Sequence, residues 1–483
     1  MSLIVYNTLT KREEEFKPLN PPQVKMYCCG ITAYDYCHLG HARTCVVWDV
    51  VRSYLVWRGY QVRYIQNFTD IDDKILNRAR QENTTMEEVA ERFIQAYFED
   101  MERLNVYKAD SYPRVTHTLD GIKRLIWELE EKGFAYQSQG DVYYAVDKFP
   151  GYGKLSGRRL EELQVGASGR IDVSASQQVK QNSFDFALWK AAKPDEPGFD
   201  SPWGKGRPGW HIECSAMIRE NLGETIDIHV GGSDLIFPHH ENEIAQSEAV
   251  TGRPLALYWL HNGMVTVNGE KMSKSLGNFI TIRELLDRYD PMAVRLFILQ
   301  THYRKPLDFS ESALQAAMGG WQTLKEALCF GYKYAKELSF EASEATSLNT
   351  DKNIENAFRE AVDSDFNFAA GLAILFELAK ELRKESNLLS HQGNFSQSSR
   401  DLLAKWHTLV SLAKILRLEV KHQDVVTQQE EIEDREIEAL VQQRSIARKQ
   451  KNYAESDRIR DYLKQKGVIL VDLPGGVTKW HRS

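Results

Sequence analysis

A strand, a helix and a second strand follow one another near the start of the chain, and this order limits the folds open to it. Residues 24–28 form a buried strand candidate, residues 41–57 carry apolar side chains at helical spacing, and residues 61–67 form the next strand. This order is the unit of a doubly wound parallel sheet, whose ligands bind at the carboxyl ends of the strands. We therefore expect the loop 29–39 to face a pocket.

The length of the chain, 483 residues with 42% hydrophobic, exceeds what one core usually holds and predicts several domains. Turn-rich sequence after residue 109 is typical of an insertion, and the pattern becomes almost wholly helical after residue 282. The expected fold class is α/β, a Rossmann-like doubly wound parallel sheet with an insertion, followed by a helical bundle and a small C-terminal domain. The expected segments are 1–108 and 209–270 (the two halves of the sheet domain), 109–208 (the insertion), 271–315 (a loop region), 316–425 (the bundle) and 430–483 (the C-terminal module).

Charge and composition exclude several classes of protein. A net charge of -7 argues against indiscriminate coating of nucleic acid or anionic membranes, although it permits a local basic face. The amino terminus has no signal-peptide pattern and no segment is apolar enough to span a bilayer, so we expect a cytoplasmic protein without a membrane partner. The six cysteines lack the spacing of a disulfide framework, which favours reduced thiols or metal ligands.

The first chemical signature is His38-Leu39-Gly40-His41, at the point where the first strand gives way to the helix. Free backbone N–H groups and the helix dipole favour an anion there, and Gly40 lets a phosphate approach the backbone. His38 and His41 add donors for charge developing on an attacked α-phosphate. The alternative is that the two histidines only cap the helix.

The second signature is Lys271-Met272-Ser273-Lys274-Ser275, in a glycine-flanked loop. Lysine is a point charge on a flexible stem, suited to following a departing pyrophosphate, and we expect Lys274 in that role with Lys271 beside it. A solvated loop with two ordinary lysines is the alternative for this segment alone. Together the two signatures predict activation of a carboxylate by ATP.

Four further residues suggest a metal centre. Cys29 ends the first strand, Cys214 opens the second half of the sheet domain, and His239 and Glu243 lie at i and i+4 of a predicted helix. Two thiolates, an imidazole and a carboxylate suit zinc. Each residue alone is more typical of a structural role, and His240 could replace His239.

These residues carry a family resemblance. The first signature is similar to the HIGH motif of class I aminoacyl-tRNA synthetases, with Leu39 in place of isoleucine, and the second is identical to their KMSKS motif. Residues 27–32, 67–74, 209–217 and 231–243 resemble hallmark segments of the cysteinyl-tRNA synthetases, and the match covers nearly the whole chain.

The resemblance implies a reaction. L-cysteine would be activated by ATP with Mg²⁺ to cysteinyl adenylate, and then transferred to the 3′ end of tRNA(Cys), with one zinc ion per chain. Because serine and cysteine are near-isosteres, a cavity separates them weakly, whereas zinc selects the soft thiolate. Zinc is thus expected to provide specificity without an editing domain.

The resemblance also assigns roles to further residues. Gly30, Thr69 and Trp210 would surround the substrate cysteine, although core packing is an alternative for Trp210. Gly40 would contact ATP, as would His229 and Asp234 around the glycine pair and Lys274 in the second signature. Three acidic residues could bind magnesium or only begin a helix: Asp70, Asp72 and Asp73.

The last fifty residues combine a basic stretch with Trp480, as RNA loop bases and phosphates require. By resemblance this module reads the anticodon, with Arg448, Asp457 and Asp472 as candidates, and 271–315 includes the stem-contact region. A salt-bridged surface helix is the alternative. We expect a monomer whose partners are tRNA(Cys), ATP and L-cysteine.

Three other functions fit part of the sequence. A ligase joining cysteine to an amino sugar would use the same adenylate but should lack the basic module. A non-catalytic relative should have lost one of the signatures, and both are present. A generic nucleotidyltransferase would explain neither the zinc ligands nor the C-terminal module.

Overall fold

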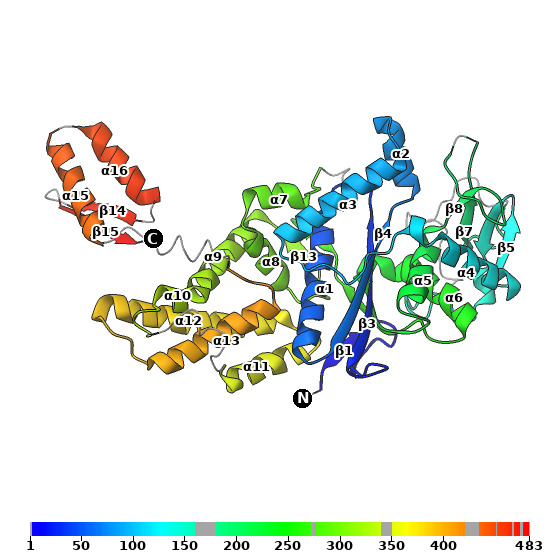
Figure 1. Cartoon of the computed structure of the whole chain (residues 1–483), viewed down its shortest axis with the longest axis horizontal. Coiled ribbons are helices and arrows are strands. Elements are labelled where there is room, and N and C mark those ends of the chain that lie inside the picture. Colours follow the sequence, from blue (N-terminus) through cyan, green and yellow to red (C-terminus); the bar gives the residue numbers. More distant parts are fainter. Residues whose placement is uncertain are drawn as a thin grey trace. The chain divides into compact units, whose positions relative to one another are not determined.

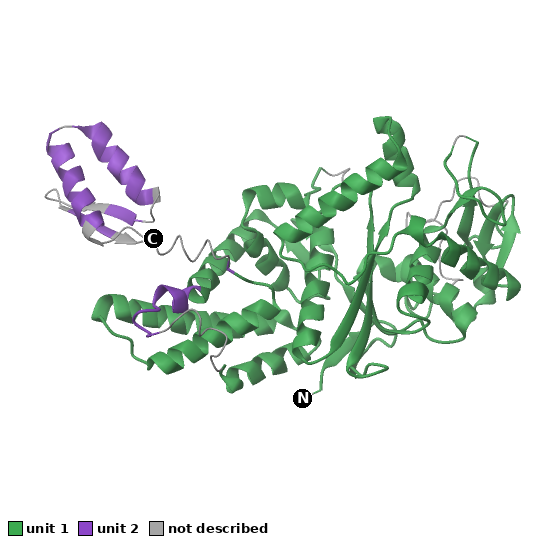
Figure 2. Cartoon of the chain, in the orientation of Figure 1, with its two compact units in different colours: residues 1–328, 347–419 green, residues 329–346, 420–483 purple. Residues whose placement is uncertain are grey.

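The computed structural model describes residues 2–159, 179–194, 196–272, 277–339, 350–420, 434–450, 452–465, 468–473 and 477–482. The chain divides into two compact units (Figure 2). The larger unit consists of residues 1–328 and 347–419, and the smaller of residues 329–346 and 420–483. No helix among the described residues is long and apolar enough to cross a membrane.

A parallel sheet of four strands, in the order β10-β9-β3-β4, forms the centre of the larger unit (Figure 1). Its strands are β3 (Gln23–Thr32), β4 (Gln61–Thr69), β9 (Ile226–Gly232) and β10 (Ala256–Asn262). Helix α1 (Leu39–Trp57) connects β3 to β4, as the sequence predicts. Because β3 pairs with β9, the two distant halves of the sheet domain meet in its middle.

Helices flank this sheet and place side chains near its carboxyl edge. They are α2 (Asp73–Glu82), α3 (Met86–Arg103), α5 (Trp210–Asn221) and α6 (Glu241–Thr251). The sequence predicts that the last helix begins at His239, but a π-helical turn, Ile236–His240, precedes it. Phe237 in that turn has extended backbone angles (φ −139°, ψ 131°), which delays the regular helix to Glu241.

In its described residues, the insertion contains the α-helix α4 and an antiparallel sheet in the order β5-β6-β7-β8. Its elements are α4 (Leu119–Glu131), β5 (Ala135–Ser138), β6 (Asp141–Tyr144), β7 (Phe186–Ala191) and β8 (Gly206–Pro208). Buried residues of the insertion, such as Tyr144 and Trp189, share one hydrophobic core with Cys29 and Cys214. The insertion therefore packs directly behind the candidate metal ligands.

The second part of the larger unit is mainly helical, as the sequence predicts. Its helices are α7 (Ile282–Arg288), α8 (Pro291–Leu299), α9 (Glu311–Leu328), α11 (Lys352–Asp363), α12 (Phe368–Gln392) and α13 (Ser399–Ile415). Fully buried Arg295 donates to Asp49 Oδ2 (2.6 Å) and to the Leu416 carbonyl (2.8 Å), which joins α8 to α1 and to the end of α13.

Short strands complete the larger unit. They are the antiparallel pair β1 (Ile4–Asn7) and β2 (Arg12–Glu15), and the small sheet of β11 (Val265–Val267), β12 (Glu270–Lys271) and β13 (Leu307–Phe309). The strand β13 interrupts the region that the sequence predicts to be almost wholly helical. Its pairing with β11 is a contact between distant segments, which periodicity does not reveal.

The smaller unit contains α10 (Phe330–Lys333), α15 (Asp434–Lys449), α16 (Tyr453–Gln465), and a hairpin of β14 (Val468–Leu473) and β15 (Val477–Arg482). The hairpin packs on α15 and α16 around a small core of Ile437, Ile459, Leu463 and Val468. The predicted fold class is confirmed, and the domain boundaries given above stay predictions.

Candidate active site and metal centre

A cavity of about 720 Å³ lies at the carboxyl edge of the central sheet. It brings segments from both halves of the sheet domain together with both signatures. The predicted site residues that line it are Cys29, Gly30, His38, Gly40, His41, Trp210, Asp234 and Lys271. The expectation that the loop after the first strand faces a pocket is confirmed.

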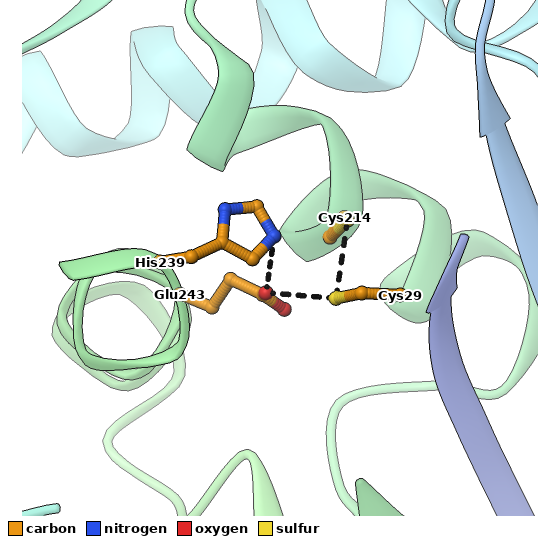
Figure 3. A group of neighbouring side chains, drawn as sticks. All are labelled: Cys29, Cys214, His239 and Glu243. Atoms are coloured by element: carbon orange, nitrogen blue, oxygen red, sulfur yellow. Dashed lines mark hydrogen bonds and ion pairs between the residues drawn. The ribbon is translucent and has the colours of Figure 1, made fainter. Parts of the chain in front are cut away.

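Four of the predicted residues converge at one end of this region (Figure 3). The Cys29 Sγ lies 3.7 Å from the Cys214 Sγ and 3.3 Å from Glu243 Oε1, and His239 Nε2 lies 3.0 Å from the same oxygen. One potential ligand atom from each residue lies within 4.8 Å of the others, and all four side chains are buried. They come from β3, α5, the π-helical turn and α6, so only the tertiary fold assembles them.

Neighbouring side chains orient these candidate ligands. His229 Nε2 is 2.8 Å from Glu243 Oε2, which leaves Oε1 directed at the cluster. His211 Nδ1 is 2.9 Å from His239 Nδ1, and the Trp210 ring stacks on His239 at 4.0 Å. A metal-binding histidine normally has its second nitrogen held by a polar neighbour, so these contacts fit a metal site.

The four candidate ligands differ in how readily each side chain ionises. Burial and the neighbouring Cys214 raise the pKa of Cys29, whereas the hydrogen bond from Cys29 lowers the pKa of Cys214 to about 6. Burial lowers the pKa of His239, but Glu243 and Cys214 outweigh it and raise the value to about 10. Burial opposes ionisation of Glu243, yet His229 and His239 hold its pKa well below the usual range. Glu243 and Cys214 are therefore anionic, whereas His239 must release its proton before its ring nitrogen can bind a cation.

His240, the alternative ligand, takes part in a different set of contacts. Its Nδ1 is 2.8 Å from His261 Nε2, and its Nε2 is 4.0 Å from Glu243 Oε1. A second group, which combines Cys29 and Glu243 with His229 and His240, also lies within metal-binding reach. That group contains one thiol instead of two. The number of thiol ligands therefore favours the set with His239.

The histidine signature caps α1 and lines the cavity at the same time. His38 is the N-cap, its Nδ1 accepts from Gly40 N (3.0 Å), and His41 Nδ1 accepts from His38 N (3.2 Å). A Cβ at Gly40 would lie 2.8 Å from the His38 ring, so glycine permits this arrangement. The two histidines can therefore cap α1 and still face a phosphate in the cavity.

These hydrogen bonds determine the ring tautomers. Because each Nδ1 accepts a backbone N–H, the neutral rings carry their proton on Nε2. Burial, His38 and Lys74 keep the pKa of His41 well below its usual value, so His41 is neutral near pH 7. The two rings stack with their centroids 3.7 Å apart, and each has its Nε2–H donor at the start of α1.

The second signature begins beside the first. Lys271 is exposed in β12 and lines the cavity, and Met272 Cε would lie 3.8 Å from a Cβ at Gly40. Lys274, the other predicted lysine, lies outside the described residues.

Of the three residues predicted to surround the substrate cysteine, Gly30 and Trp210 line the cavity, and Thr69 is absent from its lining. Gly30 N donates to Asn67 Oδ1 (2.9 Å), and a Cβ at Gly30 would lie only 1.6 Å from the Asn67 carbonyl oxygen. Thr69 ends β4, is buried, and donates to Glu213 Oε2 (2.8 Å). Trp210, besides stacking on His239, lines the cavity.

The two residues expected near adenosine have different surroundings. Asp234 lines the cavity. His229 is fully buried, stacks on Trp259 at 4.4 Å and contacts Glu243, and it is absent from the cavity lining. His229 therefore lies behind the Glu243 carboxylate and outside the lining of the cavity, and its contact with adenosine stays a prediction.

The acidic residues after β4 have local partners. Asp72 is the N-cap of α2, Asp70 accepts from Thr116, and Asp73 forms ion pairs with Lys190 and Arg207. The helix-start explanation fits Asp72 and Asp73, whereas Asp70 is held by Thr116.

The candidate anticodon residues lie in the smaller unit. Arg448 in α15 and Asp457 in α16 are exposed, and Asp472 pairs with Thr478 in the hairpin. An ion pair between Glu455 and Arg458 agrees with the salt-bridged alternative for part of α16.

Three neighbours of the predicted residues were not expected from the sequence. Glu213 holds Thr69, His211 holds His239, and Asn67 holds Gly30 and lies 3.8 Å from the Cys214 Sγ. All three lie in segments 67–74 and 209–217, which carry the family resemblance. That resemblance was the signal that could have identified them.

Comparison with known proteins decides the family. The model for the class I (C) tRNA synthetase catalytic domain matches residues 15–319, and a DALR domain model matches residues 357–421. The chain is 68% identical to a cysteine–tRNA ligase of Rippkaea orientalis and 64% identical to one of Synechocystis, each over the full length of both chains. The chain belongs to the cysteinyl-tRNA synthetases of class I.

Solved structures show that this synthetase family shares its fold with other class I enzymes. Mycobacterium tuberculosis methionyl-tRNA synthetase bound by methionyl-adenylate superposes with a TM-score of 0.56 at 16% identity, over 82% of this chain and 90% of that one. An Agrobacterium radiobacter LeuRS in complex with tRNA gives a TM-score of 0.57 at 12% identity, over 83% and 85%.

Proposed function

We propose that this synthetase selects L-cysteine with a zinc ion bound by Cys29, Cys214, His239 and Glu243. Membership of the family makes the chain a cysteine–tRNA ligase, which implies ATP, cysteine and tRNA as substrates. The observation that carries the proposal is the cluster itself, which opens through Cys29 onto the cavity that both signatures reach.

The donor set fits zinc better than harder cations. Two sulfurs, one imidazole nitrogen and one carboxylate oxygen are ligands that zinc prefers, and oxygen-preferring Mg²⁺ and Ca²⁺ would not select them. When bound, the zinc ion would supply a soft Lewis-acidic site for the thiolate of the substrate. Serine would need to ionise a far weaker acid at the same position.

The side chains around the cluster would position the rest of the amino acid. Gly30 lies beside Cys29 in the lining of the cavity, and the flat ring of Trp210 both lines the cavity and stacks on His239. Thr69, held by Glu213, would complete the pocket for the substrate. These residues would direct the carboxylate of cysteine toward the start of α1.

The other end of the cavity would bind the phosphates of ATP, accompanied by Mg²⁺. The N-terminus of α1 and the Nε2–H groups of His38 and His41 would stabilise charge on the attacked α-phosphate. Lys271, with Lys274, would attract the leaving pyrophosphate, and Asp234 would contact the adenosine moiety. No general base is assigned for the transfer to tRNA.

In the smaller unit, Arg448, Asp457 and Asp472 would contact anticodon bases of tRNA(Cys). We also infer a cytoplasmic enzyme, because all six cysteines are free thiols, as a reducing compartment requires. A monomer remains our prediction for its assembly.

Amino-acid-dependent exchange of pyrophosphate into ATP tests this proposal, on protein whose zinc content has been assayed. Exchange should occur with cysteine, be far weaker with serine, and fall when zinc is removed and return when zinc is restored. Exchange that is insensitive to zinc would refute the metal's role. Adenylation without charging of tRNA would favour the ligase that joins cysteine to an amino sugar.

A further inference from the structure

Residues 280–282, which follow the second signature, form backbone hydrogen bonds with residues 37–39, where the first signature begins. Leu39 N donates to the Ile280 carbonyl (3.1 Å), and Ile282 N donates to the Cys37 carbonyl (2.8 Å). The Phe279 ring meets the His38 ring edge-on at 5.2 Å. Any displacement of residues 279–282 would therefore be transmitted to the N-cap of α1.

One side chain connects this junction to α3. Arg283, the second residue of α7, donates to the Ala96 carbonyl (3.2 Å) and to Glu99 Oε2 (2.5 Å), and its Nε is 3.1 Å from Asp100 Oδ1. Its guanidinium also lies over the Tyr36 ring at 4.9 Å. Because Tyr36 lines the cavity, Arg283 touches α3 and the cavity wall at once.

Asp100 is the unusual member of this group. It is 1% exposed, and neither of its oxygens accepts a hydrogen bond from the described residues. Its nearest described cation is Arg283, and burial raises the pKa of Asp100 to about 6 despite that cation. A buried carboxylate without hydrogen bonds is costly and is rarely retained without a purpose.

We propose that Arg283, anchored by Asp100, is a positioning residue that fixes the exit of the second signature against the histidine loop. Removing the Arg283 guanidinium would release α7 from α3, and residues 279–282 would then no longer hold the N-cap of α1 in place. Arg283 itself touches no substrate. The proposal deepens the proposed function at the phosphate end and does not involve the metal cluster.

The test compares Arg283→Ala with Arg288→Ala in the full-length zinc-loaded enzyme. Arg288 lies on the same short helix, but pairs with exposed Glu311 and is the control. Arg283→Ala should lower kcat of pyrophosphate exchange by about 10- to 100-fold, the effect expected of a misplacement near 1 Å. KM for cysteine and zinc content should not change. Arg288→Ala should match the unmodified enzyme.

A double variant shows whether Arg283→Ala lowers kcat through lost positioning or only through lost stability. Arg283→Ala leaves the buried Asp100 carboxyl without its ion-pair partner and should lower Tm, and adding Asp100→Asn should recover part of that loss by removing the ionisable group. The exchange rate should stay low in the double variant because the guanidinium is still missing. Recovery of kcat together with Tm would overturn the inference, as would an Arg283→Ala enzyme with normal kcat.

Hydrogen exchange of residues 277–288 distinguishes failure of this inference from failure of the proposed function. These amides should exchange faster in Arg283→Ala than in Arg288→Ala, whether or not cysteine is activated. If the unmodified enzyme gave no pyrophosphate exchange, the proposed function would fail, and this measurement would still decide on the anchor. If these amides exchanged equally fast in both variants, the role of Arg283 as an anchor would be refuted.

Discussion

The two ends of the cavity are constructed in opposite ways. At the metal end, four buried side chains from four elements converge, and His229 and His211 hold them in place. At the end that would bind phosphates, the described groups belong to the start of α1 and to the exposed strand β12. Selecting a thiolate requires a fixed, water-poor site, whereas binding and releasing a triphosphate requires groups that remain accessible to it. The difference indicates that specificity and activation can be changed separately.

The largest effect is expected at the metal end. Cys214→Ser should lose zinc and lower cysteine activation by more than about 100-fold, since even outer contacts to a metal ligand are worth about 10- to 100-fold. The measurements are zinc content and pyrophosphate exchange. Cys28→Ala is the matched control, because Cys28 is equally buried but lies outside both metal-binding groups. Full zinc occupancy in Cys214→Ser would contradict the ligand set.

At the phosphate end, a variant can separate capping from chemistry. Asparagine caps helices well, so His38→Asn should keep Tm close to that of the unmodified enzyme. It should still lower kcat of exchange by about 100-fold, because one preorganised donor to the α-phosphate is lost. Zinc content should be unaffected. Normal exchange in His38→Asn would mean that His38 only caps α1.

A smaller effect is expected at Thr69, in the proposed cysteine pocket. Thr69→Val removes the hydroxyl that donates to Glu213 and should raise KM for cysteine by about 10-fold, the equivalent of one net hydrogen bond. KM for ATP should change little. Thr116→Val, near the same helix start but bonded to Asp70, serves as the control. A larger change in KM for ATP than in KM for cysteine would place Thr69 at the wrong end.

The smallest effect is expected on how the free energy of unfolding depends on pH. Burial, followed by repulsion from His38 and Lys74, keeps the folded pKa of His41 well below the value near 6.5 of the unfolded chain. The unfolded chain therefore binds a proton first, and stability present above pH 6.5 is lost as the pH falls below it. His41→Gln should lose less unfolding free energy between pH 7 and pH 5 than the unmodified protein, as measured by urea denaturation. A steeper loss would contradict a neutral buried imidazole.

Much of the fold was predictable because it depends on short-range patterns. The strand-helix-strand order around residues 24–67 follows from hydrophobic periodicity, and the structure has each of those elements. The strand β13 and the hairpin β14–β15 were not predicted, because three- to six-residue strands depend on partners that periodicity does not identify. The start of α6 was misplaced because the extended backbone of Phe237 depends on its surroundings.

The sequence alone determined the chemistry available to this protein. Both signatures are local, since a helix start or a short loop carries its function within a few residues, and the types and spacing of the thiols, imidazoles and carboxylates pointed to zinc. Only the tertiary structure decided how that chemistry is arranged. It favoured His239 over His240, directed Glu243 Oε1 to the cluster by occupying Oε2, and placed His229 behind the metal site. These outcomes depend on distances between elements far apart in the chain, and such distances are set by packing, which no local pattern contains.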